Sequence, residues 1–212
     1  MELGLLNRLI NDFGTDPDQL PLLQHALSRL WSRCTTSSNP RLLTVEGYEA
    51  IGGLTDALSN HCDEVFAELT PEQQRIAELL FRRLSGAQDD RQDVRAPARV
   101  SEVAKIAGMH PDEVIAVADA FRRPDRCFLA TPEGPLLENT LLDLSHESLI
   151  RQWRRLAGWV KDEARSAEMY RRLRDWALRW GPRRLAPDLL LLTARSRRPW
   201  RRRARTSFLR TT

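Results

Sequence analysis

The residue best placed for chemistry is His146, which stands in the run Leu144-Ser145-His146-Glu147-Ser148. The sequence predicts that Ser145 caps a new helix and that His146 and Glu147 lie in its first turn. A helix N-terminus presents free N–H groups and the positive end of the helix dipole, and both favour a phosphate group. Position alone leaves two interpretations of His146 open: a phosphate ligand, or a packed and hydrogen-bonded histidine.

Other kinds of active site lack the residues that they need. Neither of the two lysines, Lys105 and Lys161, follows a glycine, although a phosphate-binding P-loop requires a Gly-Lys step. No Gly-x-Ser-x-Gly nucleophile motif occurs. The four histidines never stand three or four positions apart, so no metal-binding pair on one helix is predicted. We therefore expect neither a catalytic nor a metal-ligating residue in this chain.

The cysteines and the hydropathy pattern indicate a compartment. The three cysteines are widely spaced and form no Cys-x-x-Cys pair, which argues against a disulfide framework and against a zinc site. No run of 18 apolar residues is present, and the N-terminal residues lack the basic start and cleavage site of a signal peptide. We expect a cytoplasmic chain with reduced thiols and no membrane contact.

The charge is distributed unevenly along the chain. Residues 1–180 have a net charge of −5, whereas residues 181–212 hold ten arginines and one acid, a net charge of +9. Two interpretations of this tail stay open. It is either a disordered basic segment that contacts anions or nucleic acid nonspecifically, or the product of a frameshift beyond about Leu191.

The spacing of apolar residues predicts a mainly α architecture. Helical spacing recurs over residues 3–12, 18–33 and 54–69, which we assign to a small helical domain over residues 1–69. The run Thr70-Pro71-Glu72-Gln73 then combines a cap, a proline at the first helical position and a capping box. It predicts the start of a further helix.

The next elements predict a winged helix-turn-helix domain over residues 70–150. Residues 86–99 are polar and indicate a loop, and short helices follow at 101–107 and 111–122. Residues 127–130 and 141–144 then carry the β signal of a hairpin. Helices followed by a hairpin are the order of a winged helix.

A C-terminal helical pair is expected over residues 151–180, before the basic tail at 181–212. Aromatic and aliphatic residues recur in it at helical spacing. They are Trp153, Leu156, Trp159, Val160, Tyr170, Leu173, Trp176 and Trp180. This stripe is expected to pack in the core or between helices rather than to form a ligand cage.

Three segments together resemble one protein family. In chain order they read DPDQLPLLQHALSRLW, LTVEGYEAIGGLTDALSNHCDEVFAELTPEQQRIAELLFRRL and HESLIRQWRRLAGWVKDE. They resemble the corresponding segments of the novel STAND ATPases, bacterial signalling relatives of the apoptosome and plant resistance ATPases. The resemblance covers roughly residues 3–180 and concerns only the helical and winged-helix portion of such proteins.

The resemblance implies roles for three residues at a nucleotide site. Pro21 falls on the proline that packs against adenine, with Gln19 where the wider pattern has glycine. His146 falls on the histidine that contacts the β-phosphate of ADP, with Ser145 in place of methionine. Arg151 either reaches the same phosphates or forms an i,i+4 pair with Glu147.

The leading functional hypothesis is a regulatory fragment of a STAND signalling ATPase. The resemblance implies an upstream core that supplies the P-loop and Walker B strand and binds ADP or ATP with Mg²⁺. It implies as partners this core, sister subunits and a downstream sensor domain of WD-type or TPR-type repeats. The ADP form would hold the winged helix closed, and exchange for ATP would release it for oligomerisation.

Two other interpretations remain. The first is a DNA-binding transcriptional regulator, since a winged helix and an arginine-rich tail are both predicted. Its candidate recognition helix carries Asp112, Glu113 and Asp119, with basic residues only at its end, and acids facing phosphates repel. The second is an inert remnant, which is compatible with the fragment hypothesis and retains only interaction surfaces.

Overall fold

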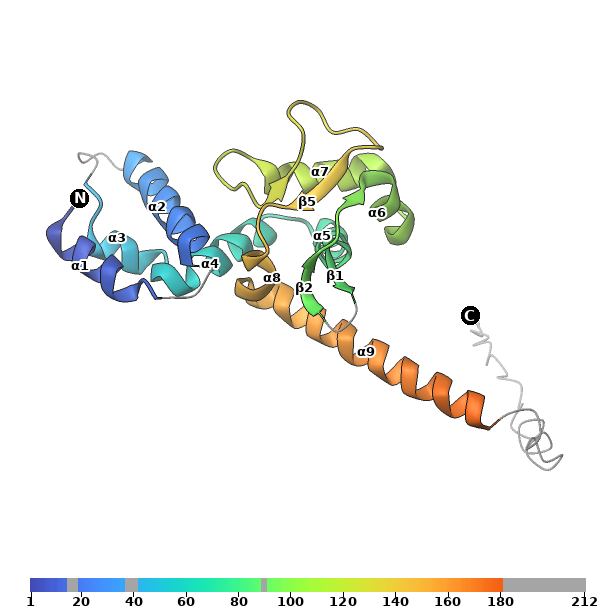
Figure 1. The fold of residues 1–212 in the computed structure, drawn as a ribbon. Coiled ribbons are helices and arrows are strands. Elements are labelled where there is room, and N and C mark those ends of the chain that lie inside the picture. The colour runs from blue at the N-terminus through green and yellow to red at the C-terminus, as the bar shows by residue number, and fades with distance from the viewer. Residues whose placement is uncertain (15–18, 37–41, 89–90, 181–212) are drawn as a thin grey trace, which may run out of the picture. The chain divides into compact units, whose positions relative to one another are not determined.

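The computed structural model describes the chain except for residues 15–18, 37–41, 89–90 and 181–212 (Figure 1). The described part contains nine helices and two small antiparallel sheets, which confirms the mainly α architecture. The chain divides into two compact units, Met1–Ser166 and Ala167–Thr212. The frameshift and disorder predictions for the tail fall on residues outside the described part. The domain boundaries at 69/70 and 150/151 stay predictions.

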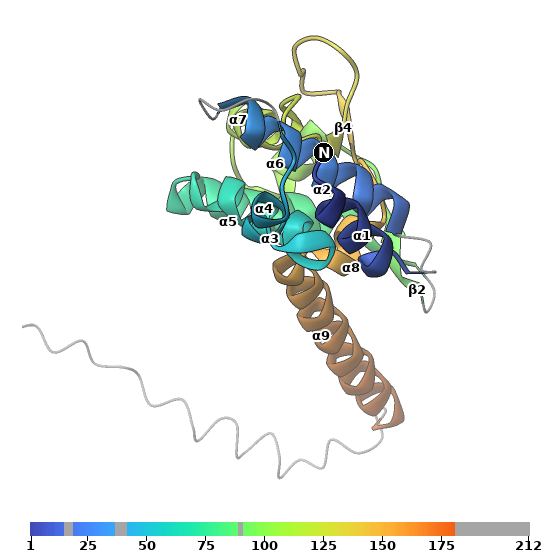
Figure 2. The same ribbon diagram turned by 90° about the vertical axis from the view of Figure 1, so that its left-hand side faces the viewer.

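Four helices form the N-terminal part of the first unit. They are α1 (Leu3–Asp12), α2 (Gln19–Thr36), α3 (Val45–Ala50) and α4 (Gly53–Ala67). Helix α2 packs along α4, and α1 packs on α3 (Figures 1 and 2). The buried face of α1 carries Leu5 and Leu9, and Tyr48 of α3 donates its hydroxyl to Asp12 Oδ2 at 3.0 Å. Apolar residues at helical spacing thus form the predicted bundle.

Helix α5 (Pro71–Leu84) begins where the sequence predicts. The side chain of Thr70 accepts the N–H of Gln73, and the Gln73 side chain accepts the N–H of Thr70, which completes the capping box. The helix ends at Ser85, whose hydroxyl donates to the carbonyl of Phe81 at 2.6 Å. Both helix ends therefore have local partners for their backbone groups.

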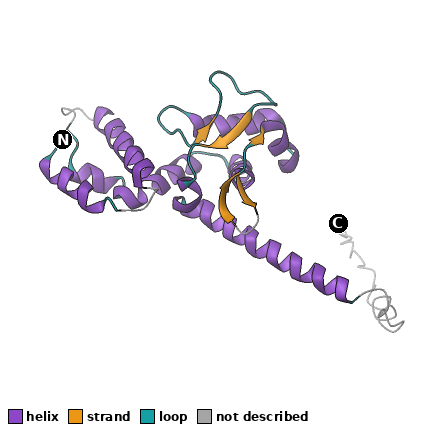
Figure 3. Cartoon of the chain, in the orientation of Figure 1, coloured by secondary structure: helices purple, strands orange, loops and turns teal. Residues whose placement is uncertain are grey.

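The segment after α5 differs from the prediction of a loop over residues 86–99. It forms an antiparallel hairpin of β1 (Ser85–Gln88) and β2 (Arg91–Arg95), followed by β3 (Ala98–Arg99) (Figure 3). The loop assignment was wrong because this sequence is polar and shows no alternation of apolar and polar residues. Its strands are held by backbone pairing, which leaves no trace in the side-chain pattern.

The winged-helix arrangement follows from β3 onward. Helices α6 (Val100–Ala107) and α7 (Pro111–Arg122) precede β4 (Leu129–Ala130) and β5 (Leu141–Leu144). The three short strands form a sheet in the order β3-β5-β4. The two predicted helices and the predicted hairpin are thus found at their predicted places.

Two helices of very different length close the described part. They are α8 (Ser148–Gln152) and α9 (Arg154–Arg179). The tryptophan stripe divides between the two compact units. In the first unit Trp153 and Leu156 are fully buried, whereas in the second Leu173 and Trp176 are exposed. The packing prediction is confirmed for the first part of the stripe and is wrong for the second.

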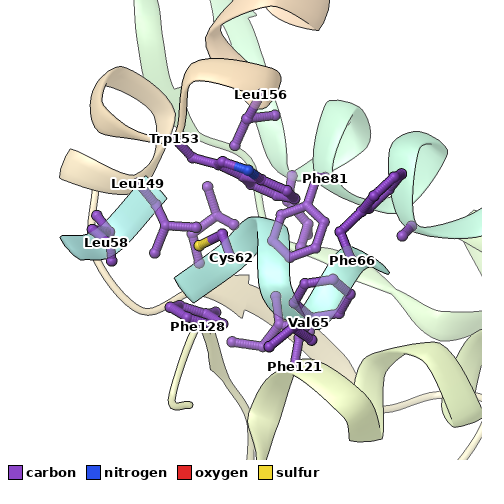
Figure 4. Close-up of a cluster of buried hydrophobic side chains, with 14 of the residues drawn as sticks. Leu58, Cys62, Val65, Phe66, Phe81, Phe121, Phe128, Leu149, Trp153 and Leu156 are labelled. Atoms are coloured by element: carbon purple, nitrogen blue, oxygen red, sulfur yellow. The ribbon is translucent and has the colours of Figure 1, made fainter. Parts of the chain in front are cut away.

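Trp153 is the centre of the core in the first unit (Figure 4). Its ring lies edge-on to Phe81, with 4.9 Å between the ring centroids, and its Nε1–H donates to Asp63 Oδ1 at 3.0 Å. Phe121 and Phe66 also face it, with ring centroids at 6.2 and 6.3 Å. The cluster joins α4, α5, α7 and the junction between α8 and α9, where Trp153 lies. It therefore fixes the frame that carries the candidate site.

Candidate functional site

His146 lies between β5 and α8, one residue before the N-cap Glu147, and its side chain accepts the N–H of the first residue of α8. The Nδ1 atom accepts the backbone N–H of Ser148 at 3.1 Å and lies 3.0 Å from the Ser148 hydroxyl. The prediction that Ser145 caps this helix was wrong. The backbone N–H of Ser145 instead donates to the carbonyl of Phe128 at 3.0 Å, which prolongs the strand pairing. Because α8 has only five residues, its dipole is a weak source of phosphate attraction.

The Ser148 N–H contact at Nδ1 favours one tautomer of the His146 ring. Since Nδ1 accepts an N–H group, the proton of the neutral ring resides on Nε2. The residue is exposed, and in this tautomer Nε2–H is the hydrogen-bond donor of the ring. Such a donor suits the oxygen of a phosphate group. His146 is thus hydrogen-bonded at Nδ1, as the second interpretation expects, but it is exposed rather than packed. Its contact with a phosphate stays a prediction.

Arg95 of β2 braces the segment that carries His146. Its guanidinium donates to Asp143 Oδ2 at 3.0 Å and to the carbonyl of Leu144 at 3.2 Å, and it lies 3.7 Å from Glu147 Oε1. These contacts flank His146 on both sides in the sequence. Arg95 was missed from the sequence because it falls in the segment assigned to a loop. Only its hairpin places it against β5.

Arg151 lies in α8, one helical turn after Glu147, and its residue is exposed. Its predicted pairing with Glu147 and its alternative contact with phosphates both stay predictions. Glu147 itself interacts with Arg95, as described above. The acid next to His146 is thus near a second arginine that sequence spacing did not suggest.

Pro21 lies in the first turn of α2 and is half-buried. Two positions before it, Gln19 has a buried Oε1 atom that finds no hydrogen-bond partner in the described structure. The connection from Pro21 to His146 is indirect. One turn further along α2, the ring of His25 lies 5.6 Å from that of Phe128, whose carbonyl accepts the N–H of Ser145. The structure thus links two of the predicted site residues through a short series of contacts.

A pair of histidines lies along this connection. His25 of α2 and His61 of α4 are 36 positions apart, and Nε2 of the first lies 3.3 Å from Nδ1 of the second. Burial, followed by the charge of Arg29, lowers the pKa of His25 to about 4 and that of His61 to about 3. Both rings are therefore neutral near pH 7. Sequence reasoning missed this pair because it considered only spacings within one helix.

The described residues offer neither a metal-binding cluster nor a membrane-spanning helix. They contain no cluster of three or more histidine, cysteine or acidic side chains that could hold a metal ion. All three cysteines lie in this part and are free thiols. Burial raises the pKa of the Cys62 thiol well above its usual value, so this group stays protonated. Among the same residues, no helix combines the length and hydropathy needed to cross a bilayer.

Comparison with known proteins identifies the family. No curated protein and no solved structure gives a significant match. A family model does match: that of Novel STAND NTPase 1, over residues 1–188. This match includes the α2 segment with Pro21, the winged-helix elements and the His146 segment. Since it covers most of the sequence, the chain belongs to the Novel STAND NTPase 1 family.

Proposed function

We propose that this chain is the helical and winged-helix regulatory part of a STAND signalling ATPase and that it holds ADP in the off state. The family relationship implies nucleotide binding. The observation that carries the finer proposal is the geometry of His146, an exposed residue whose Nδ1 accepts the Ser148 N–H; we assign its other ring nitrogen, Nε2–H, as the donor to the nucleotide. A neutral donor held in this way suits the β-phosphate of ADP.

The residues of this chain fit one edge of a nucleotide site. His146 supplies a donor for a phosphate, and Pro21 supplies a flat apolar surface for an adenine ring. Neither lysine follows a glycine, so this sequence contains no P-loop to surround the phosphates. In the proposal, an ATPase core supplies that loop and the Mg²⁺ ion, which neutralises phosphate charge when bound. This chain then acts by holding the bound nucleotide against the core, which keeps the protein closed, rather than by hydrolysing the nucleotide.

A docking face for the ATPase core is available on α1. Leu3, Leu6 and Ile10 follow one another at spacings of three and four residues and are 75, 41 and 63% exposed. Phe13, just after the helix, is also exposed. An exposed apolar row of this kind is typical of an interaction surface. We assign it to the ATPase core or a sister subunit and expect a repeat-type sensor domain as a further partner.

The switch follows from differential nucleotide contacts. ADP bridges the core and His146, and this bridge stabilises the closed arrangement. Exchange for ATP removes the bridge and shifts the population toward an open form that oligomerises. The chain by itself lacks the core contacts, so its affinity for free ADP is expected to be very weak. Micromolar binding of ADP by the 212-residue chain in calorimetry would contradict this.

The central test is ADP affinity in a protein that joins this chain to its ATPase core. His146→Asn retains a short acceptor for the Ser148 N–H but removes the Nε2–H donor. We expect it to weaken ADP binding about tenfold, the effect of one hydrogen bond to a charged group. His110→Asn is the matched control, because His110 also caps a helix with Nδ1, at 3.4 Å from the Asp112 nitrogen. Equal ADP affinities for the two variants would refute the role of His146.

The DNA-binding alternative finds less support. In α7 the exposed first turn is acidic, with Asp112 and Glu113. Arg122 donates to Asp119 Oδ1 at 2.5 Å and to the carbonyl of Gly134 at 2.9 Å, so its charge is used within the fold. A gel-shift assay separates the hypotheses. Sequence-specific binding that Arg122→Ala with Arg123→Ala abolishes would favour a regulator, whereas binding lost only on deletion of residues 191–212 indicates nonspecific tail contact.

A further inference from the structure

We propose that Phe128 is a positioning residue that couples the two sides of the nucleotide site, because it holds the His146 segment against the helix that carries Pro21. This inference rests on the function proposed above. It adds a residue outside the three that the sequence suggested. Phe128 touches no nucleotide in this proposal and acts only through its neighbours.

The ring of Phe128 is inserted between α2 and α4. It is 1% exposed and lies edge-on to His61, with 5.0 Å between the ring centroids and 71° between the planes. On the α2 side, the centroid of the His25 ring lies 5.6 Å from the centroid of the Phe128 ring. Edge-on and tilted arrangements at these distances are favourable for aromatic pairs. The neutral histidines thus form a socket for this ring.

The backbone of Phe128 holds the His146 segment. Its carbonyl accepts the N–H of Ser145 at 3.0 Å, and its own N–H donates to the carbonyl of Phe121 at 3.0 Å. Ser145 immediately precedes His146. A shift of Phe128 must therefore displace the start of the segment that presents the Nε2–H donor.

One of the two histidines around the Phe128 ring, His25, lies in the same helix as Pro21. His25 follows Pro21 by four positions in α2, and residues so spaced share one face of a helix. The ring contact with His25 therefore sets how closely the winged-helix part approaches that face. Through this contact and the Ser145 hydrogen bond, one residue fixes the placement of Pro21 relative to His146.

A second anchor holds the same segment onto α4. Arg126 is 8% exposed and donates to Glu68 Oε2 at 2.6 Å and to the carbonyl of Ala120 at 2.9 Å. Glu68 is the C-terminal cap of α4. Between the two anchors Cys127 has a φ of 51°, a left-handed conformation that disfavours side chains other than glycine. The two anchors maintain this strained residue, as expected of a segment whose position matters.

The test compares two conservative variants of buried phenylalanines. Phe128→Leu removes the aromatic contacts with His25, His61 and Phe121 but keeps an apolar side chain. Phe81→Leu is the control, since Phe81 is equally buried and shares the Phe121 contact, but its other ring partner is Trp153 rather than the two histidines. We expect both to lower the midpoint of urea unfolding. Only Phe128→Leu should weaken ADP binding about tenfold in the core-linked protein, because it misaligns a hydrogen bond to a charged group.

A nucleotide-free readout separates this inference from the proposed function. In the 212-residue chain, we expect Phe128→Leu, but not Phe81→Leu, to speed hydrogen exchange of the Ser145 amide and to shift the NMR signals of the His146 ring. If these signals respond but His146→Asn leaves ADP affinity unchanged, the proposed function fails and the mechanical link stands. If the Ser145 and His146 signals do not respond, or Phe81→Leu weakens ADP binding equally, the positioning role is refuted.

Discussion

The Nδ1 atom of His61 lies 3.3 Å from the Nε2 atom of His25, although the two residues are 36 positions apart. When both rings are neutral, one can donate N–H to the unprotonated nitrogen of the other. Protonation of both rings would place two N–H groups against each other beside Arg29, which already lowers the pKa of each ring. The pair thus joins α2 to α4 only in its neutral or singly protonated form.

The first prediction is that stability falls as the pH drops below about 6.5. In the folded chain burial lowers the pKa values to about 4 for His25 and about 3 for His61, from about 6.5 for an unperturbed histidine. The unfolded chain therefore binds more protons throughout this window, and the free energy of unfolding decreases with acidification. Each histidine contributes a slope of up to about 1.4 kcal/mol per pH unit. The contribution is fully present above pH 6.5 and is lost as pH falls toward the folded pKa values.

Urea unfolding at pH 7, 6 and 5 measures this dependence. His61→Gln should reduce the slope between pH 6.5 and 4, because one of the two buried groups no longer titrates. His110→Gln is the matched histidine substitution outside this pair, since the side chain of His110 is 68% exposed. A wild-type stability that is flat over this range would rule out buried neutral histidines at these positions.

The second prediction contrasts two tryptophans of the same stripe. Trp153 is fully buried and hydrogen-bonded to Asp63, whereas Trp176 is 66% exposed. We expect Trp153→Ala to lower the free energy of unfolding by about 3–5 kcal/mol through the cavity that it leaves. Trp176→Ala should change it by no more than about 0.5 kcal/mol. Chemical unfolding followed by circular dichroism tests both, and a comparable loss from Trp176→Ala would show that this residue is covered in solution.

The third prediction concerns two glycines in left-handed conformations. Gly52 has a φ of 96°, and a Cβ atom there would lie 2.9 Å from Asp56 Cβ and 2.5 Å from Asn60 Nδ2. Gly108 has a φ of 66°, but a Cβ there would meet open space. Gly108→Ala should therefore cost only the backbone strain, about 1–2 kcal/mol. Gly52→Ala should cost more, since strain and overlap add. Equal shifts in the thermal midpoint would mean that α4 moves to relieve the overlap.

Much of the fold could be predicted from the sequence because its signals are local. The capping box of Thr70 and Gln73 requires only residues three positions apart, and α5 begins where it indicates. The hairpin after residue 84 could not be predicted, since its polar strands pair through backbone groups. The start of α8 was misplaced for a similar reason. Ser145 has the right residue type for a cap, but its N–H donates to the carbonyl of Phe128, and this bond keeps Ser145 in the β4–β5 strand pairing rather than at a helix start.

In the candidate site, too, only the residues with a local sequence signal could be predicted. His146 could be proposed from its position and from the family resemblance, and both are local in sequence. Arg95 and Phe128 could not, because each reaches the His146 segment only after strands distant in sequence have paired. The contact between His25 and His61 likewise depends on how α2 packs along α4. Residues that position a ligand group from another element leave no periodic signal along the chain.

The fourth prediction uses the strained backbone at Cys127. The left-handed conformation at a φ of 51° costs a residue other than glycine about 1–2 kcal/mol, and the side chain is exposed, so little packing depends on it. Cys127→Gly removes this strain, but glycine loses more backbone entropy on folding, about 0.5–1 kcal/mol. We expect a net gain in stability of up to about 1 kcal/mol.

Cys127→Ala is the matched control, because it keeps the strain and loses the contact of Sγ with the Pro124 carbonyl at 3.2 Å. Under reducing conditions the unfolding midpoints should rank glycine above wild type and alanine at or below it. An alanine variant as stable as the glycine variant would show that the backbone at this position carries no strain, and it would remove one of the reasons for regarding the segment as held under tension by its two anchors.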